Sequence, residues 1–123
     1  MQFRESQAIY LQIADHVCER ILLKEWKPGM RIPSVREMAV QLEVNPNTVM
    51  RTYEFLQGQN IIHNQRGIGY FVSTDAVKSA TQYRKTEFIE KELPNIFRNI
   101  YILGMDIDEL KSRYEKFKKQ HFP

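Results

Sequence analysis

The side chains with the clearest capacity for chemistry lie in residues 45–54. Asn47, Arg51 and Glu54 fall on one face of a predicted helix, and Thr48 lies near its beginning. Asn can pair with adenine through two hydrogen bonds, and Arg can bind guanine or a phosphate. The Thr48 hydroxyl can donate to a phosphate, assisted by the positive end of the helix dipole. This polar face therefore indicates contact with a nucleic acid.

Two flanking segments carry further groups of the same kind. Arg36 lies in the first turn of the preceding predicted helix, where it can reach a DNA backbone or a base edge. Gly67 and Gly69 carry no side chain and so let a loop approach a backbone closely, while Arg66 adds positive charge. Each group is a weak signal by itself, because a single arginine is usually solvated and two glycines usually mark only a turn. Their order and spacing carry the specificity.

The elements that must position these groups have clear start and stop signals. Apolar residues at every fourth position predict a helix over residues 6–25, which ends at Lys27-Pro28-Gly29. Ser34 and Glu37 have the spacing of a capping box and begin a short second helix. After a tight turn, Asn45-Pro46 supplies a favoured N-cap and a proline at the first position of a third helix.

Beyond the third helix the hydrophobic period changes. Asn60 can end that helix in a left-handed conformation, and short β-prone runs at residues 61–65 and 70–73 flank a turn at residues 66–69. Two short helices joined by a tight turn, followed by this hairpin, have helix-turn-helix geometry with a small β wing. The fold class is therefore mainly α with a small β-hairpin.

Residues 74–123 are predicted to be helical and to need a partner. An apolar seam with heptad-like spacing is interrupted by Pro94, where we expect a kink, or else two helices. Asp106 begins a further helix. Helices of this length bury too little surface to form a core alone. We expect them to pair with the same helices of a second chain; the alternative is that they fold back on their own winged domain. The expected dimer interface comprises Ile89, Leu93, Ile96, Ile100, Leu103, Leu110 and Tyr114.

The predicted organisation is a winged helix-turn-helix domain over residues 1–75 and a two-helix dimerisation region over residues 76–123. The sequence pI near 9.0 does not by itself indicate DNA binding. Residues 1–75 hold eight of the 18 Lys and Arg and eight of the 15 Asp and Glu, so the excess of positive charge lies in residues 76–123. Non-specific attraction of the winged domain for DNA should therefore be modest.

Other classes of protein are disfavoured. The three histidines are scattered without metal-ligand spacing, so we expect no metal, no cofactor and no enzymatic activity. Cys18, the single cysteine, cannot form an internal disulfide and is expected to be a small buried residue. No apolar run is long enough to cross a membrane, and the N-terminus lacks a signal-peptide core, so a cytoplasmic location is expected. The 123 residues leave little room for a sensor domain.

The sequence resembles the GntR family of bacterial transcription regulators, and within it the short YtrA-type subfamily. The matching motifs cover about the first 73 residues and form a specific combination. They are Ile9-Tyr10-Leu11-Gln12-Ile13, the run from Pro28 to Ala39, Val44-Asn45-Pro46-Asn47-Thr48-Val49, Arg51-Thr52-Tyr53-Glu54-Phe55-Leu56, and Arg66-Gly67-Ile68-Gly69-Tyr70-Phe71-Val72. The chain departs from the family where many members have arginine in place of Pro46 and glycine in place of Asn60.

The resemblance implies a homodimeric repressor that binds double-stranded operator DNA of its own operon or of a transporter operon. It leaves open whether a small-molecule effector binds. Carried over by position, the DNA contacts of the family fall on Ser34, Arg36, Asn45, Asn47, Thr48, Arg51 and Gly67. Arg66 is added to these expected DNA contacts because it supplies positive charge beside the glycines of the wing. The competing hypothesis is a winged module that binds another protein and has no affinity for DNA. The Asn, Thr and Arg side chains on the outward face favour DNA, while Phe55 near the edge of that face has no explanation in the sequence.

Overall fold

The computed structural model describes residues 1–3 and 6–123, and its contacts divide the chain into two compact units. The first unit is Met1–Lys85 and the second is Thr86–Pro123. The first unit includes the start of the helix α4 (Ala76–Glu87), because Ala76 and Ala80 are fully buried in its core. By contacts the division falls after Lys85, and the predicted domain boundary at residue 75 stays a prediction.

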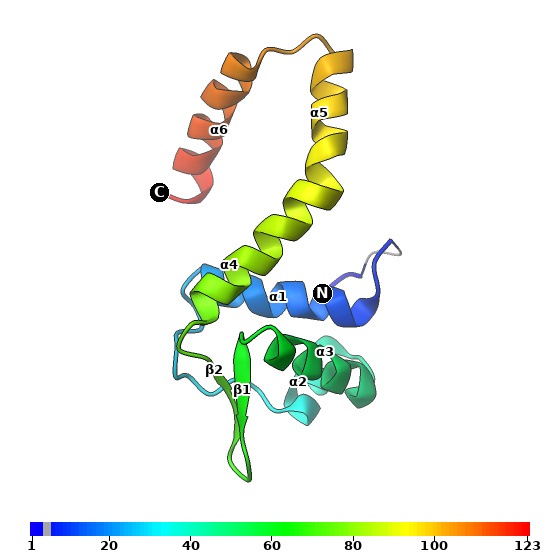
Figure 1. The fold of residues 1–123 in the computed structure, drawn as a ribbon, viewed down its shortest axis with the longest axis vertical. Helices are drawn as coiled ribbons and strands as arrows, with labels where there is room; N and C mark the ends of the chain where they lie inside the picture. The colour runs from blue at the N-terminus through cyan, green and yellow to red at the C-terminus, as the bar shows by residue number, and fades with distance from the viewer. Residues whose placement is uncertain (4–5) are drawn as a thin grey trace. The chain divides into compact units, whose positions relative to one another are not determined.

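In the described part of the first unit, three helices and a β-hairpin precede α4 (Figure 1). The helices are α1 (Ile9–Leu22), α2 (Val35–Leu42) and α3 (Pro46–Gly58). Helix α1 is shorter than the predicted range of residues 6–25, and its first apolar residue, Ile9, is 44% exposed. The later positions of the same stripe, Ile13, Val17 and Ile21, are fully buried and form the core with apolar side chains of α2, α3 and the hairpin.

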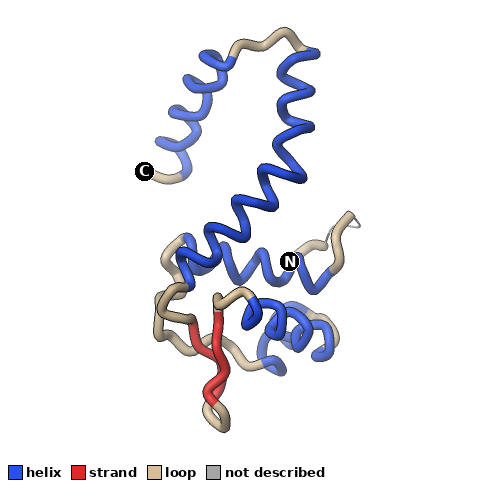
Figure 2. The backbone as a smooth tube through the Cα atoms, in the orientation of Figure 1, coloured by secondary structure: helices blue, strands red, loops and turns tan. Residues whose placement is uncertain are grey.

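The two strands pair in antiparallel fashion, as Figure 2 shows. Strand β1 (Ile62–Gln65) lies beside β2 (Gly69–Val72), with Ile62 opposite Val72 and Gln65 opposite Gly69. A third segment, residues 29–32, follows the other edge of β2. The amide of Ile32 donates to the carbonyl oxygen of Tyr70 at 3.0 Å, and that of Val72 donates to Met30 at 2.9 Å. The hairpin is thus anchored to the segment that precedes α2.

In the second unit, helical backbone continues through Pro94. A π-helical turn, η1 (Phe88–Glu92), comes directly before α5 (Leu93–Ile102), which contains Pro94 in its first turn. Proline has no amide hydrogen and its ring crowds the carbonyl group four residues earlier, so a wider turn at this place relieves the crowding. Helix α5 ends at Ile102, two residues before Gly104, which is left-handed with φ +65°. Asp106 then caps α6 (Ile107–His121).

The described part of the second unit has no buried side chain in η1, α5 or α6. Of the predicted interface residues, Leu93, Ile100 and Leu110 are partly exposed, and Ile89, Ile96, Leu103 and Tyr114 are exposed. Phe97 and Ile102 add further exposed apolar surface. In residues 1–3 and 6–123, no helix is both long and apolar enough to cross a membrane.

Candidate nucleic-acid interface

The start of α2 is fixed by the predicted capping box. The Ser34 hydroxyl accepts a hydrogen bond from the Glu37 amide, and the Glu37 carboxylate accepts one from the Ser34 amide, both at 3.1 Å. Hydrogen bonding of the Glu37 carboxylate to the backbone and then to the side chain of Ser34 lowers its pKa, with the nearby Arg31 making a smaller contribution. Arg36, the next predicted contact, is exposed in this first turn. The capping box therefore fixes the start of α2, and with it the positions of Ser34 and Arg36.

A turn of three residues joins α2 to α3. Glu43 caps the end of α2 in the left-handed region with φ +55°. Asn45 caps the beginning of α3, where its Oδ1 accepts a hydrogen bond from the Asn47 amide at 2.8 Å. Arg36 and Pro46 line one open hollow together with Ala39, Val40 and Val44, so the beginnings of the two helices lie side by side. The cap on α3 uses Oδ1 of Asn45, and the Nδ2 group is not part of it.

The predicted polar face of α3 is exposed. Asn47 and Arg51 are exposed and Thr48 is partly buried, whereas Val49, Tyr53 and Leu56 on the opposite face are fully buried. The Tyr53 hydroxyl donates to the carbonyl oxygen of Pro33 at 2.6 Å, which ties α3 to the start of α2. The other end of α3 is closed as predicted, since Asn60 has φ +61°.

The wing places Arg66 and Gly67 at its tip. Both are exposed, Gly67 has φ +77°, and the hairpin extends away from the helices of the first unit (Figure 1). At the other end of the turn, a Cβ on Gly69 would lie 2.9 Å from Nε of Arg31. Arg31 thus covers the base of the turn, a position that sequence patterns did not indicate.

The side chain of Arg51 is held by a residue outside the helix-turn-helix. Its guanidinium carbon lies over the ring of Tyr10 in α1, 4.0 Å from the ring centroid. Phe55, whose role the sequence left unexplained, packs edge-on against both Tyr10 and Tyr83, with centroid separations of 6.4 and 5.1 Å. These aromatic contacts join residues far apart in the chain, and no local signal in the sequence predicts them.

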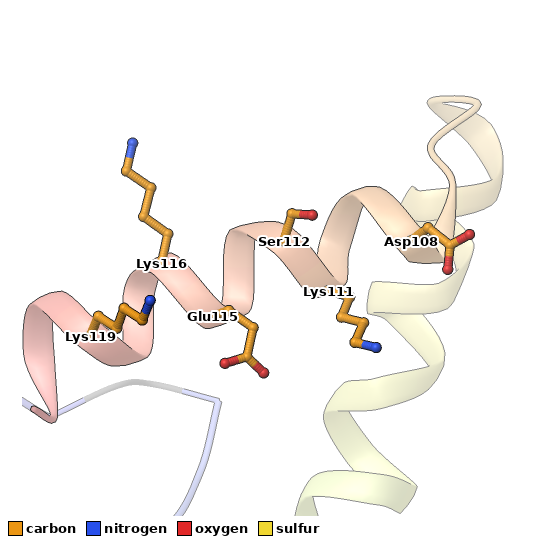
Figure 3. A pocket seen from close by; sticks show the side chains of 6 residues that line it. All are labelled: Asp108, Lys111, Ser112, Glu115, Lys116 and Lys119. Carbon is orange, nitrogen blue, oxygen red and sulfur yellow. The ribbon is translucent and has the colours of Figure 1, made fainter.

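The hollow drawn in Figure 3 does not resemble a ligand site. All six of its lining residues belong to α6, and Lys116 and Ser112 project to the opposite side of the helix from Lys111 and Glu115 (Figure 3). Side chains that diverge along one helix cannot enclose a small molecule. Among the described residues, no group of three His, Cys, Asp or Glu side chains is placed to hold a metal ion.

The capped pair of short helices, the exposed polar face of α3 and the adjacent hairpin define a winged helix-turn-helix protein of the kind that binds DNA. Residues 9–72 match the family described as bacterial regulatory proteins, gntR family, and the chain belongs to this family of DNA-binding transcription regulators. The predicted family and fold class are thereby confirmed.

Two curated relatives from Bacillus subtilis (strain 168) match over most of the chain. One, an uncharacterized HTH-type transcriptional regulator named YhcF, is 37% identical over 116 residues, which cover 94% of each protein. The other, the HTH-type transcriptional repressor YtrA, is 34% identical over 107 residues, covering 87% of this chain and 82% of YtrA. A crystal structure of a GntR-family regulator from Bacteroides thetaiotaomicron is 48% identical with a TM-score of 0.71, covering 92% of this chain and 98% of that one.

Proposed function

We propose that the chain is a homodimeric, sequence-specific repressor that reads a near-palindromic operator with α3 and the wing. The observation that carries the proposal is the exposed polar face at the beginning of α3, in a chain whose α2 and turn hold that face in a fixed position. A helix of this kind fits the major groove. The family membership supports DNA as the ligand.

The proposed contacts follow from the chemistry of each side chain. Asn47 and Arg51 read base edges, while Thr48 and the Nδ2 group of Asn45 donate to phosphates at the beginning of α3. Ser34 and Arg36 bind from the beginning of α2, and Arg66 and Gly67 approach the backbone from the wing. Pro46 carries no group that can make such a polar contact, so the first turn of α3 relies on its neighbours for recognition.

The contacts are tested with Arg36→Ala and Arg51→Ala. A DNA fragment recovered from the genome by binding to the wild-type protein serves as the ligand in a gel-shift titration. Each substitution is expected to weaken binding by about 5- to 150-fold, since a good bidentate base contact is worth about 1–3 kcal/mol. The control is Lys78→Ala, which removes one positive charge from an exposed position of α4. Unchanged affinity in both arginine variants would refute the proposed interface.

The second unit supports the dimer part of the proposal. Its described helices leave their apolar seam open, with Leu103 70% and Ile96 40% exposed. A second copy of the same seam is the proposed cover, because closed two-fold pairing is the commonest way for a chain to bury a self-complementary surface. Two copies of α3 would then meet successive major grooves about 34 Å apart, or a multiple of that distance.

The dimer is tested by placing a charge in the seam. Ile100→Glu should shift the protein from dimer to monomer in sedimentation equilibrium and weaken operator binding, because a carboxylate would be buried between two apolar faces. Arg98→Glu adds the same side chain at an exposed position outside the predicted seam and should leave the dimer intact. A dimer that persists in Ile100→Glu would show that this seam is not the interface.

Repression is supported by the relative YtrA of Bacillus subtilis, which is a transcriptional repressor. Sequencing of the recovered genomic fragments identifies the operator, and a reporter gene placed behind it measures the direction of control. Expression that rises when the protein is absent supports repression, whereas expression that falls contradicts it. Failure to recover any specific fragment would favour a winged module that binds another protein.

A further inference from the structure

Tyr10 of α1 lies directly behind the proposed DNA-binding arginine of α3. The guanidinium carbon of Arg51 is 4.0 Å from the centroid of the Tyr10 ring, and Arg51 is exposed while Tyr10 is partly buried. A hydrogen bond joins the two helices at the same place: the buried hydroxyl of Thr52 in α3 donates to the backbone carbonyl oxygen of Tyr10 in α1 at 2.7 Å. The stacking partner is therefore set by the packing of α1 on α3.

The ring of Tyr10 is itself held in place. Phe55, one turn beyond Arg51 on α3, meets it edge-on with an interplanar angle of 78°. Phe55 is in turn packed against Tyr83 at 67°. Side chains from α1, α3 and α4 thus form a row of aromatic rings, and Arg51 lies at its solvent-exposed end.

Such a support matters because arginine is a flexible side chain. An exposed arginine loses rotamer freedom when DNA orders it, and this loss opposes binding. An aromatic ring beneath the guanidinium attracts the cation through its quadrupole and restricts the side chain before DNA arrives. The N–H groups remain free to point outward from the ring, since the attraction to the ring face does not consume a hydrogen-bond donor.

We infer that Tyr10 is a positioning residue for DNA recognition, which holds Arg51 of α3 in its binding conformation. The inference rests on the proposed contact between Arg51 and DNA, and it assigns a role in recognition to a residue outside the helix-turn-helix. Tyr10 does not touch DNA in this arrangement. Its effect on affinity should therefore require the presence of Arg51.

A double-mutant cycle tests this dependence. Operator affinity is measured by fluorescence anisotropy for the wild type, Tyr10→Leu, Arg51→Ala and the double variant. Tyr10→Leu is expected to weaken binding about two- to fivefold, corresponding to an exposed cation–π contact. Tyr10→Phe keeps the ring and should bind within twofold of the wild type. In the Arg51→Ala background, Tyr10→Leu should have no further effect.

A control cycle uses Arg36→Ala, which removes a proposed contact that is not stacked on Tyr10. Tyr10→Leu should keep its full effect in that background. Equal weakening by Tyr10→Leu with and without Arg51 would overturn the inference, because the ring would then act only through the fold. Thermal unfolding of each variant measures that general effect directly.

The remaining outcomes separate the inference from the proposed function. If Tyr10→Leu binds the operator with unchanged affinity, the proposed role of Tyr10 is refuted. The proposed contact between Arg51 and DNA then still stands if Arg51→Ala weakens binding. If Arg51→Ala binds the operator as tightly as the wild type, Arg51 does not contact DNA, and the inference about Tyr10 is wrong as well.

Discussion

The hydroxyl of Tyr53 makes one of the bonds that hold the recognition helix in place. Tyr53 is fully buried, and its hydroxyl donates to the carbonyl oxygen of Pro33 at 2.6 Å, just before the cap of α2. Tyr53→Phe keeps the ring and removes this donor. Because loss of a hydrogen-bond partner in a buried place costs about 1–3 kcal/mol, we expect the free energy of unfolding to fall by that amount. For a domain of this size each kcal/mol lowers Tm by about 4–8 °C.

The matched control is Tyr70→Phe. The two rings are in edge contact with centroids 4.8 Å apart, but the Tyr70 hydroxyl donates to Sδ of Met50 at 4.0 Å. A thioether sulfur is a weak acceptor, so Tyr70→Phe should cost less than about 0.5 kcal/mol. Urea unfolding followed by circular dichroism measures both variants. Equal stability of Tyr53→Phe and the wild type, or equal losses in both variants, would refute the reasoning.

Tyr53→Phe should also change how the free energy of unfolding depends on pH at high pH. Burial raises the pKa of Tyr53 above its ordinary value, and the neighbouring Tyr70 and Glu37 raise it further. Above about pH 10 the tyrosine of the unfolded chain loses a proton that the folded protein retains. The free energy of unfolding should therefore decrease as the pH rises past this value. Tyr53→Phe removes this contribution, so its stability should decline less steeply than that of the wild type between pH 10 and the alkaline end of the titration.

Three further predictions concern single groups of the first unit. Burial raises the pKa of the Cys18 thiol to about 12, so an aromatic disulfide reagent at pH 8 should react with it only on the timescale of unfolding; rapid reaction of the folded protein would contradict this. The lowered pKa of Glu37 stabilises the fold above its ordinary value of 4.5, and this stability is lost as the pH falls through the folded pKa. Glu37→Gln should flatten that acid-side decline in urea titrations, and identical declines would disprove it. Gly69→Ala should lower the free energy of unfolding by about 1–3 kcal/mol because φ is +146°, whereas Gly58→Ala, with open space around it, should not be destabilising; equal effects would exclude backbone strain as the cause.

The helix-turn-helix was predictable because its signals are local. The capping box at Ser34 and Glu37, the Asn45-Pro46 helix start and the left-handed Asn60 each depend on residues within a few positions of one another. Such signals determine where a helix begins and ends whatever the rest of the chain does. They therefore place the two short helices and the exposed face of α3 correctly.

The support of that face could not be predicted, because it depends on tertiary contacts. Tyr10 and Phe55 are separated by 45 positions in the sequence numbering and meet only when α1 packs on α3. Arg31 likewise reaches Gly69 only because residues 29–32 pair with β2. Helical periodicity indicates that a residue is near the edge of a polar face, but it does not say which element covers that edge. Phe55 is the clearest example.

The net charge of the chain does not indicate where the proposed DNA-binding surface lies. The positive surplus lies in residues 76–123, where Arg113 is within 3.3 Å of Glu109 and Lys118 within 3.4 Å of Glu115. The predicted winged domain, residues 1–75, holds the proposed DNA contacts in a balanced set of eight basic and eight acidic side chains. Its affinity must then come from a few well-placed groups rather than from a broad electrostatic field, and such groups are useful only if they are held in position. Capping bonds at Ser34 and Asn45 and the ring beneath Arg51 supply that positioning.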